Sequence, residues 1–110
     1  MIVKLYKDKL EKSGYAVDYA VTSASAMALL LKKKYGLILL DIMLPGGENG
    51  FDLLEKLKKD ERFKMIPVIV VTNLDGQEKI ARDIGASDCL VKSNISLETL
   101  LDKISNFLSA

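Results

Sequence analysis

Two short, uninterrupted apolar runs constrain the fold of this chain more than any other feature. The first is Gly36-Leu37-Ile38-Leu39-Leu40, which ends at Asp41, and the second is Val68-Ile69-Val70-Val71, which ends at Thr72. Strands without polar alternation are buried on both faces, and this occurs when helices cover both sides of a parallel sheet. The two runs therefore predict an α/β fold built on a parallel sheet.

Segments with helical spacing surround these runs. Apolar residues three or four positions apart predict helices over residues 1–13, 22–34 and 51–59, a short helix ending at residue 85, and a last helix after Ser96. Two further strands are predicted at residues 15–20 and 89–92. The alternating order indicates one doubly wound domain over residues 1–110, because parallel neighbours need helical crossovers.

The composition excludes several classes of function. The chain has 110 residues, no His, one Cys and a formal net charge of +1. Without an imidazole, catalytic triads and zinc-hydrolase sites are not expected, and a near-neutral chain offers no basic field for nucleic acid. A single Cys permits no internal disulfide, and no apolar run reaches the roughly 18 residues of a membrane span. No signal peptide is visible either, so we expect a cytoplasmic protein. Since triads and zinc-hydrolase sites are not expected, we also expect that the protein is not an enzyme.

Polar residues stand at the carboxyl ends of three predicted strands, namely Asp41, Thr72 and Lys92. Each has an ordinary explanation by itself: a turn or cap for the Asp, strand propensity for the Thr, and solvent exposure for the Lys. Together they matter more, because the site of an open parallel sheet lies beyond the carboxyl ends of its strands. A carboxylate there can accept a phosphoryl group, while a hydroxyl and an ammonium group hold the transferred oxygens.

Three motifs in order resemble the receiver domains of response regulators, also called CheY-like domains. They are Leu39-Leu40-Asp41-Ile42-Met43-Leu44-Pro45 with Asn49-Gly50-Phe51, then Val68-Ile69-Val70-Val71-Thr72-Asn73, then Gly85-Ala86-Ser87-Asp88-Cys89-Leu90-Val91-Lys92. The resemblance runs from Met1 to the C-terminus. It implies a flavodoxin-like sheet and a role in a two-component phosphorelay.

The resemblance also implies a role for individual residues. Asp41 is the expected phosphoacceptor of a histidine kinase, Thr72 the residue that bonds the phosphoryl oxygen, and Lys92 the cation that pairs with it. Magnesium is the family's cofactor, and Asp41 with the backbone carbonyl of Met43 would supply ligands to it. Cys89 stands at the position of the family's switch aromatic, and the output would be altered contact with a downstream effector protein.

One departure from the family pattern concerns the start of the chain. Family members begin with a strand that ends in an acidic pair, and the pair holds the magnesium ion. Here Met1 falls inside the expected first helix, and Asp8 and Glu11 lie within that helix, where they cannot replace the pair. We therefore expect weak or absent magnesium binding and weak phosphorylation of this chain by itself.

The same departure affects the sheet. In the family's strand order, 2-1-3-4-5, the first strand is central, and its loss leaves the strands around Val17 and Leu39 facing a gap. Unpaired strand edges are costly when buried and adhesive when exposed. We expect a homo-oligomer, a rearranged strand order, or completion of the sheet by another chain or segment.

Two alternatives to a signalling module remain at this point. One is a truncated or engineered fragment of the receiver fold without activity. The other is a flavodoxin-like cofactor binder, which the sequence disfavours because no strand is followed by a phosphate loop rich in Ser, Thr and Gly.

Overall fold

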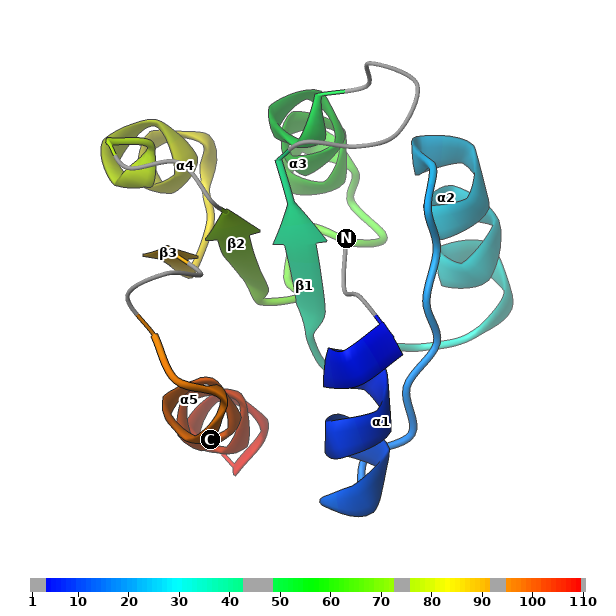
Figure 1. Ribbon diagram of the computed structural model, residues 1–110. Helices are drawn as coiled ribbons and strands as arrows, with labels where there is room; N and C mark the ends of the chain where they lie inside the picture. Colours follow the sequence, from blue (N-terminus) through cyan, green and yellow to red (C-terminus); the bar gives the residue numbers. More distant parts are fainter. Residues whose placement is uncertain (1–3, 43–48, 73–75, 92–94, 110) are drawn as a thin grey trace.

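A parallel sheet between two layers of helices forms the structure, a computed structural model that describes residues 4–42, 49–72, 76–91 and 95–109 (Figure 1). Helices and strands alternate over most of the chain, as the sequence predicts. Their bounds are α1 Lys4–Lys12, α2 Ser23–Lys32, β1 Ile38–Asp41, α3 Gly50–Lys59, β2 Val68–Thr72, α4 Glu78–Ile84, β3 Asp88–Val91 and α5 Leu97–Ser109.

The described sheet has three strands in the order β1-β2-β3, and both pairings are parallel. Asp41 pairs with Val71 across the first interface, and Thr72 pairs with Val91 across the second. Every residue of β2 is buried, which confirms that its unbroken apolar run reflects cover on both faces. The expected rearrangement of strand order is absent from these three strands, which follow one another in space as they do in sequence.

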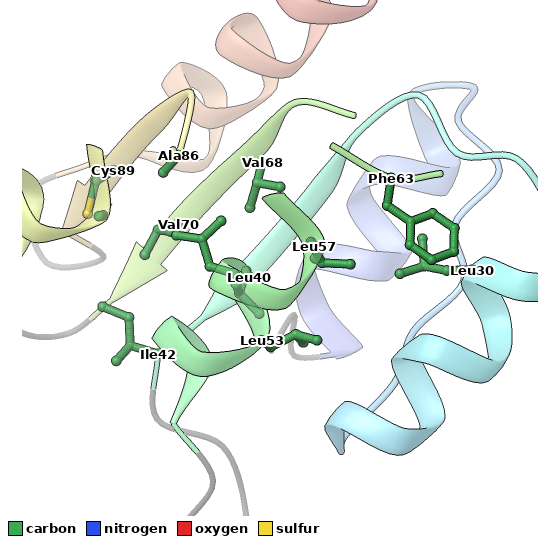
Figure 2. Packing of buried hydrophobic residues seen from close by; sticks show 12 residues of the cluster. Leu30, Leu40, Ile42, Leu53, Leu57, Phe63, Val68, Val70, Ala86 and Cys89 are labelled. Carbon is green, nitrogen blue, oxygen red and sulfur yellow. The ribbon is translucent and has the colours of Figure 1, made fainter. Parts of the chain in front are cut away.

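Alternate residues of the strands pack into two separate hydrophobic cores, one on each face of the sheet. On one face, Leu40, Val68 and Val70 pack against α2, α3 and α4, and Figure 2 shows this cluster with Leu30, Leu53 and Leu57 around it. On the other face, Ile69 and Val71 pack against α1 and α5 through Leu10, Leu100 and Ile104. The period of two along each strand thus assigns each side chain to a helical layer.

The strand predicted at residues 15–20 is wrong. Those residues are extended, with Tyr15 and Val17 half-buried against the α1–α5 core, but they form no strand. A strand exists only where a neighbour accepts and donates its backbone hydrogen bonds. Within the described residues β1 pairs with β2 alone, so this segment has no strand beside it.

Several helix ends agree with the sequence prediction. The hydroxyl of Thr22 accepts a hydrogen bond from the Ser25 N–H at 3.0 Å and caps α2, and Ser96 caps α5 in the same way with the Thr99 N–H at 3.1 Å. Gly14 closes α1 with φ of +99°, a conformation that favours glycine. Among the described helices, none is both long enough and apolar enough to cross a membrane.

Asp88 connects α4, β3 and α5 through one carboxylate. Its Oδ1 accepts hydrogen bonds from Arg82 at 3.1 Å and from the Cys89 N–H at 2.8 Å, and its Oδ2 accepts one from Lys103 at 3.0 Å. Partial burial alone would raise the pKa of this carboxyl, but these three donors outweigh it and hold the pKa below its ordinary value of 3.8. The charged form of Asp88 therefore stabilises the fold.

Replacing Asp88 should destabilise the protein in a pH-dependent way. We expect Asp88→Asn to lower the free energy of unfolding by about 1 kcal/mol at neutral pH, a modest value because both cations are partly exposed. A depressed folded pKa contributes stability above 3.8, and this contribution disappears as the pH falls through the folded pKa. Urea denaturation of both proteins should therefore give different midpoints at pH 7, and the midpoints should converge as the pH falls below 3.8 through the folded pKa.

Asp83→Asn provides the matched control, because Asp83 also lies on α4 but makes only an exposed pair with Lys79. Its midpoint should follow that of the unmodified protein at every pH. A difference for Asp88→Asn that stays constant between neutral and acid pH would contradict the assignment.

Candidate functional site

Two of the three predicted site residues lie at the carboxyl ends of neighbouring strands. Asp41 is the last residue of β1 and Thr72 the last residue of β2. Because Asp41 pairs with Val71, Thr72 lies one residue further along the neighbouring strand, whose backbone runs about 4.8 Å from that of β1. A carboxylate residue and a hydroxyl residue therefore end neighbouring strands at the edge where parallel sheets place their sites.

The two residues differ in burial. Thr72 is 0% exposed, and it is the one buried polar residue among the described part of the chain. Asp41 is half-buried at the strand end. Asp41 and Thr72 each make at least one further polar or electrostatic interaction. Buried polar groups are hydrogen-bonded as a rule, and among the described residues no buried side-chain nitrogen or oxygen lacks a partner.

Gly50 lies close against the backbone of Asp41 and Ile42. Its N–H donates to the Ile42 carbonyl at 2.7 Å, and a Cβ at this position would lie 2.3 Å from the Asp41 carbonyl oxygen and 2.7 Å from the Ile42 Cα. The side chain of Asn49 caps the helix that follows by accepting from the Phe51 N–H at 2.8 Å. The N-terminus of α3 therefore packs directly against the end of β1.

Sequence reasoning placed Gly50 in a resemblance motif but gave it no role. The available signal was the dipeptide Asn49-Gly50 directly before a helical pattern, since Asn is a preferred N-cap residue. The need for glycine comes from contact with the end of β1, nine residues earlier, which no local pattern reveals.

Two predicted site residues, Lys92 and Met43, lie outside the described residues. Lys92 follows Val91, the last residue of β3, and Met43 follows Ile42. Their predicted roles as phosphoryl-pairing cation and as carbonyl ligand stay predictions.

The described residues do not make a magnesium site. Within ranges 4–42, 49–72, 76–91 and 95–109, no group of three or more Asp, Glu, His or Cys side chains converges. Asp8 and Glu11 lie on α1, as the sequence predicted, and both are exposed. Magnesium takes six oxygen ligands, and one half-buried carboxylate is a poor set of protein donors for it. We therefore assign no chemical step to a metal ion.

Cys89, at the predicted switch position, lies in β3 and is 5% exposed. Its side chain packs in the same apolar cluster as Val70 and Ala86 (Figure 2). Burial raises the pKa of the thiol, with a smaller contribution from the nearby carboxylates of Glu78 and Asp88. The thiol is therefore protonated at neutral pH, and a thiolate role for Cys89 is unfavourable.

Comparison with known proteins identifies relatives in bacterial signalling. The model of the response regulator receiver domain family matches residues 1–105. Response regulator PleD of Caulobacter vibrioides is 38% identical over 92 residues, which are 82% of this chain and 20% of that protein. Protein PilH of Pseudomonas aeruginosa is 38% identical over 102 residues, or 91% of this chain and 83% of PilH. The chain thus spans a fifth of the length of PleD but most of the length of PilH.

Solved structures resemble the fold closely. The Francisella response regulator 1452 receiver domain superposes with a TM-score of 0.86 at 26% identity, covering 96% of this chain and 86% of that one. The chemotaxis response regulator CheY4 of Vibrio cholerae gives a TM-score of 0.82 at 26% identity, with coverage of 96% and 88%. The arrangement of helices and strands is therefore that of CheY-like proteins.

The contact between Gly50 and β1 gives a test of how the site is held. We expect Gly50→Ala to lower the free energy of unfolding by about 2 kcal/mol or more, because the added methyl group meets backbone atoms that cannot move aside. The amide resonances of Asp41 and Ile42 should shift in the same variant. Urea denaturation and a two-dimensional NMR spectrum measure these effects.

Gly36→Ala is the matched control, because its added methyl group would meet only the Cδ2 of Leu108, at 2.9 Å. That atom is the end of a flexible side chain, so the loss should stay below about 1 kcal/mol. Equal losses in the two variants would show that the contact with β1 is not special.

Proposed function

Since this chain belongs to the response regulator receiver domain family, we propose that it is a phosphoacceptor module of a two-component phosphorelay and that Asp41 accepts the phosphoryl group. The observation that carries this proposal is the position of Asp41. It ends β1 at the carboxyl edge of the sheet, half-buried, next to the fully buried Thr72 on β2. This is the place and the pair of functional groups that a transfer to a carboxylate requires.

The proposed transfer starts from a phosphohistidine of a partner kinase. A carboxylate oxygen of Asp41 attacks the phosphorus, the phosphorus–nitrogen bond breaks, and the imidazole leaves and takes a proton from water. The product is an acyl phosphate on Asp41. The chain thus receives a group that a partner delivers, and its own contribution is to position the acceptor and stabilise the oxygens.

Thr72 and Lys92 are the proposed stabilising groups. The Thr72 hydroxyl would donate a hydrogen bond to a phosphoryl oxygen, and the Lys92 ammonium group, which directly follows β3 in sequence, would pair with the charge. The phosphoryl group adds negative charge at the ends of the strands. The proposed output is a changed surface near this edge that an effector protein recognises.

Magnesium is the family's expected cofactor, but the described residues supply few ligands for it. We therefore propose that this chain alone takes up phosphoryl groups slowly. The alternative, a fragment of the receiver fold without activity, predicts no uptake at all.

Phosphorylation of Asp41 can be tested with a small donor. We expect the intact mass of the chain to increase by one phosphoryl group in a minor fraction of molecules after incubation with acetyl phosphate and magnesium chloride. Asp41→Asn should show no increase, because the amide is not a nucleophile toward phosphorus. Mass spectrometry of the intact protein distinguishes these outcomes.

Asp52→Asn is the matched control, since Asp52 is an exposed carboxylate in the first turn of α3. It should be phosphorylated as the unmodified chain is. An equal mass increase in Asp41→Asn would refute Asp41 as the acceptor, and no increase in any protein would favour the inactive fragment.

Thr72 gives a separate prediction about the transfer step. Thr72→Val keeps the shape of the buried side chain and removes its hydroxyl group, so the sheet should remain folded. We expect the rate of Asp41 phosphorylation to fall about tenfold to a hundredfold, since one hydrogen bond to the transferred group is lost. Thr72→Ser, which keeps a hydroxyl group, should recover most of the rate.

The rate is measured from the increase of the phosphorylated mass with time, and circular dichroism checks the fold. An unchanged rate in Thr72→Val would refute the proposed role of the hydroxyl group.

A further inference from the structure

Charged side chains are divided unevenly between the two ends of the sheet. A helix that links two parallel strands returns the chain to the amino end of the next strand, so its last turn lies at that end. Basic residues occupy the last turns of α1, α2 and α3, namely Lys9, Lys12, Lys32, Lys56, Lys58 and Lys59. Acidic residues occupy the first turns of α3, α4 and α5, namely Asp52, Glu78 and Glu98. Each position suits the dipole of its own helix, and together they give the molecule a basic end and an acidic end, although the formal net charge is only +1.

The basic end consists of these three last turns and of two connections, residues 33–37 and residues 60–67. In Figure 1 α1 and α2 run against the direction of the β1 arrow, and the chain passes from the end of α2 to the base of that arrow. The Ile38 N–H donates to the Pro67 carbonyl at 3.0 Å, which joins the two connections where β1 and β2 begin. Leu30 and Phe63 pack in one core cluster, shown in Figure 2, and hold the end of α2 against the second connection.

Positive charge is in excess at this end. Four of its cations are paired with carboxylates, namely Lys33 with Asp18, Lys59 with Glu55, Arg62 with Asp60, and Lys64 with Glu61. Lys32, Lys34 and Lys56 are exposed and belong to none of the ion pairs among the described residues. Their ammonium groups are therefore available to an anionic partner.

Two apolar side chains protrude from the same end. Leu31, in the last turn of α2, is 61% exposed, and Met65, in the connection before β2, is 83% exposed. No other large apolar side chain of the described residues is as exposed as these two. Leu31 directly precedes Lys32-Lys33-Lys34, and Met65 directly follows Lys64. A single exposed apolar side chain is ordinary, but here the two most exposed ones both stand among lysines.

The backbone that carries Met65 is held in place by a buried contact. Lys58 Nζ donates to the carbonyl of Lys64 at 3.2 Å and to the carbonyl of Ile66 at 2.8 Å, so both neighbours of Met65 are fixed. Phe63 is buried, and the Arg62 guanidinium lies 5.0 Å from the centre of its ring. Met65 therefore projects from an ordered turn, and little conformational freedom would be lost when it binds.

From these observations we propose that the basic end binds the surface of a membrane that contains anionic lipids, with Leu31 and Met65 inserted among the head groups. A plane of negative charge attracts the basic end and repels the acidic end, so it binds and orients a protein whose net charge is close to zero. Apolar side chains among lysines suit this interface, because they enter the head-group layer while the ammonium groups stay at the lipid phosphates. A nucleic acid also offers phosphates, but it offers no apolar layer to Leu31 and Met65.

Binding in this orientation leaves the candidate site accessible. Asp41 and Thr72 end their strands at the opposite edge of the sheet, away from the proposed contact. The proposal does not depend on phosphoryl transfer to Asp41. Asp41→Asn should therefore bind membranes as the unmodified chain does, and failure of one proposal leaves the other intact.

The test measures binding of the intact chain to vesicles by sedimentation. We expect binding to vesicles of phosphatidylcholine that contain about one third phosphatidylglycerol, and no measurable binding to phosphatidylcholine alone. The Debye length shrinks from about 10 Å at 0.1 M salt to about 3 Å at 1 M. The affinity for the anionic vesicles should therefore fall at least tenfold over that range.

Two matched pairs of variants locate the contact. Lys34→Glu and Lys79→Glu change the net charge equally, but Lys34 lies at the basic end and Lys79 is an exposed residue at the start of α4. We expect the first to weaken binding about tenfold and the second to change it less than about threefold. Leu31→Ser should weaken binding at least threefold, whereas Ile80→Ser, at a residue of α4 that is 48% exposed, should leave it unchanged. Circular dichroism checks that each variant is folded.

Several outcomes would overturn the proposal. They are equal losses in the two members of either pair, equal binding of neutral and anionic vesicles, and absence of binding to both. Tighter binding to a DNA duplex than to the anionic vesicles, compared at equal phosphate concentration, would overturn the assignment to lipid and favour a nucleic acid as the partner.

Discussion

Parallel pairing along β2 is the constraint on which the rest of the structure depends. All five residues of β2 are buried, and the strand is hydrogen-bonded to β1 on one side and to β3 on the other. Buried backbone groups must be paired, so β2 can be buried throughout only because both of its edges are occupied. Its alternating side chains then divide the helices into two layers, with Val68 and Val70 facing α3 and Ile69 and Val71 facing α5.

This arrangement also explains why chemistry gathers at one edge. The carboxyl ends of parallel strands lie at the same edge of the sheet, so the first polar residue after each apolar run comes to that edge. Asp41 and Thr72 are polar where their neighbours in the strands are apolar, and burial of Thr72 without a partner would cost free energy. The close contact of Gly50, at the start of α3, with the end of β1 fixes the backbone of Asp41. Site geometry and sheet stability thus depend on the same contacts.

The opposite edge of β1 has another character. It borders a cavity of about 260 Å³ that is lined mostly by apolar side chains and by residues 15–20. Contacts of Asp18 with Tyr35 and Lys33 join those residues to the connection between α2 and β1. The same strand therefore ends at the candidate site and lines an apolar cavity along its length.

The sequence by itself determined the α/β class and the two apolar strands β1 and β2, with Asp41 and Thr72 at their ends, because these follow from local periodicity. It also determined the helix caps at Thr22 and Ser96, which follow from capping chemistry. The resemblance motifs led to the family that the comparisons then identified. Tertiary structure alone decided three things. Residues 15–20 have the composition of a strand but form none, since pairing depends on a neighbour distant in the chain. Gly50 is required by its approach to β1, and Asp88 acquires its low pKa from side chains on α4 and α5. Each depends on contacts between residues that only folding brings together, and local patterns carry no information about them.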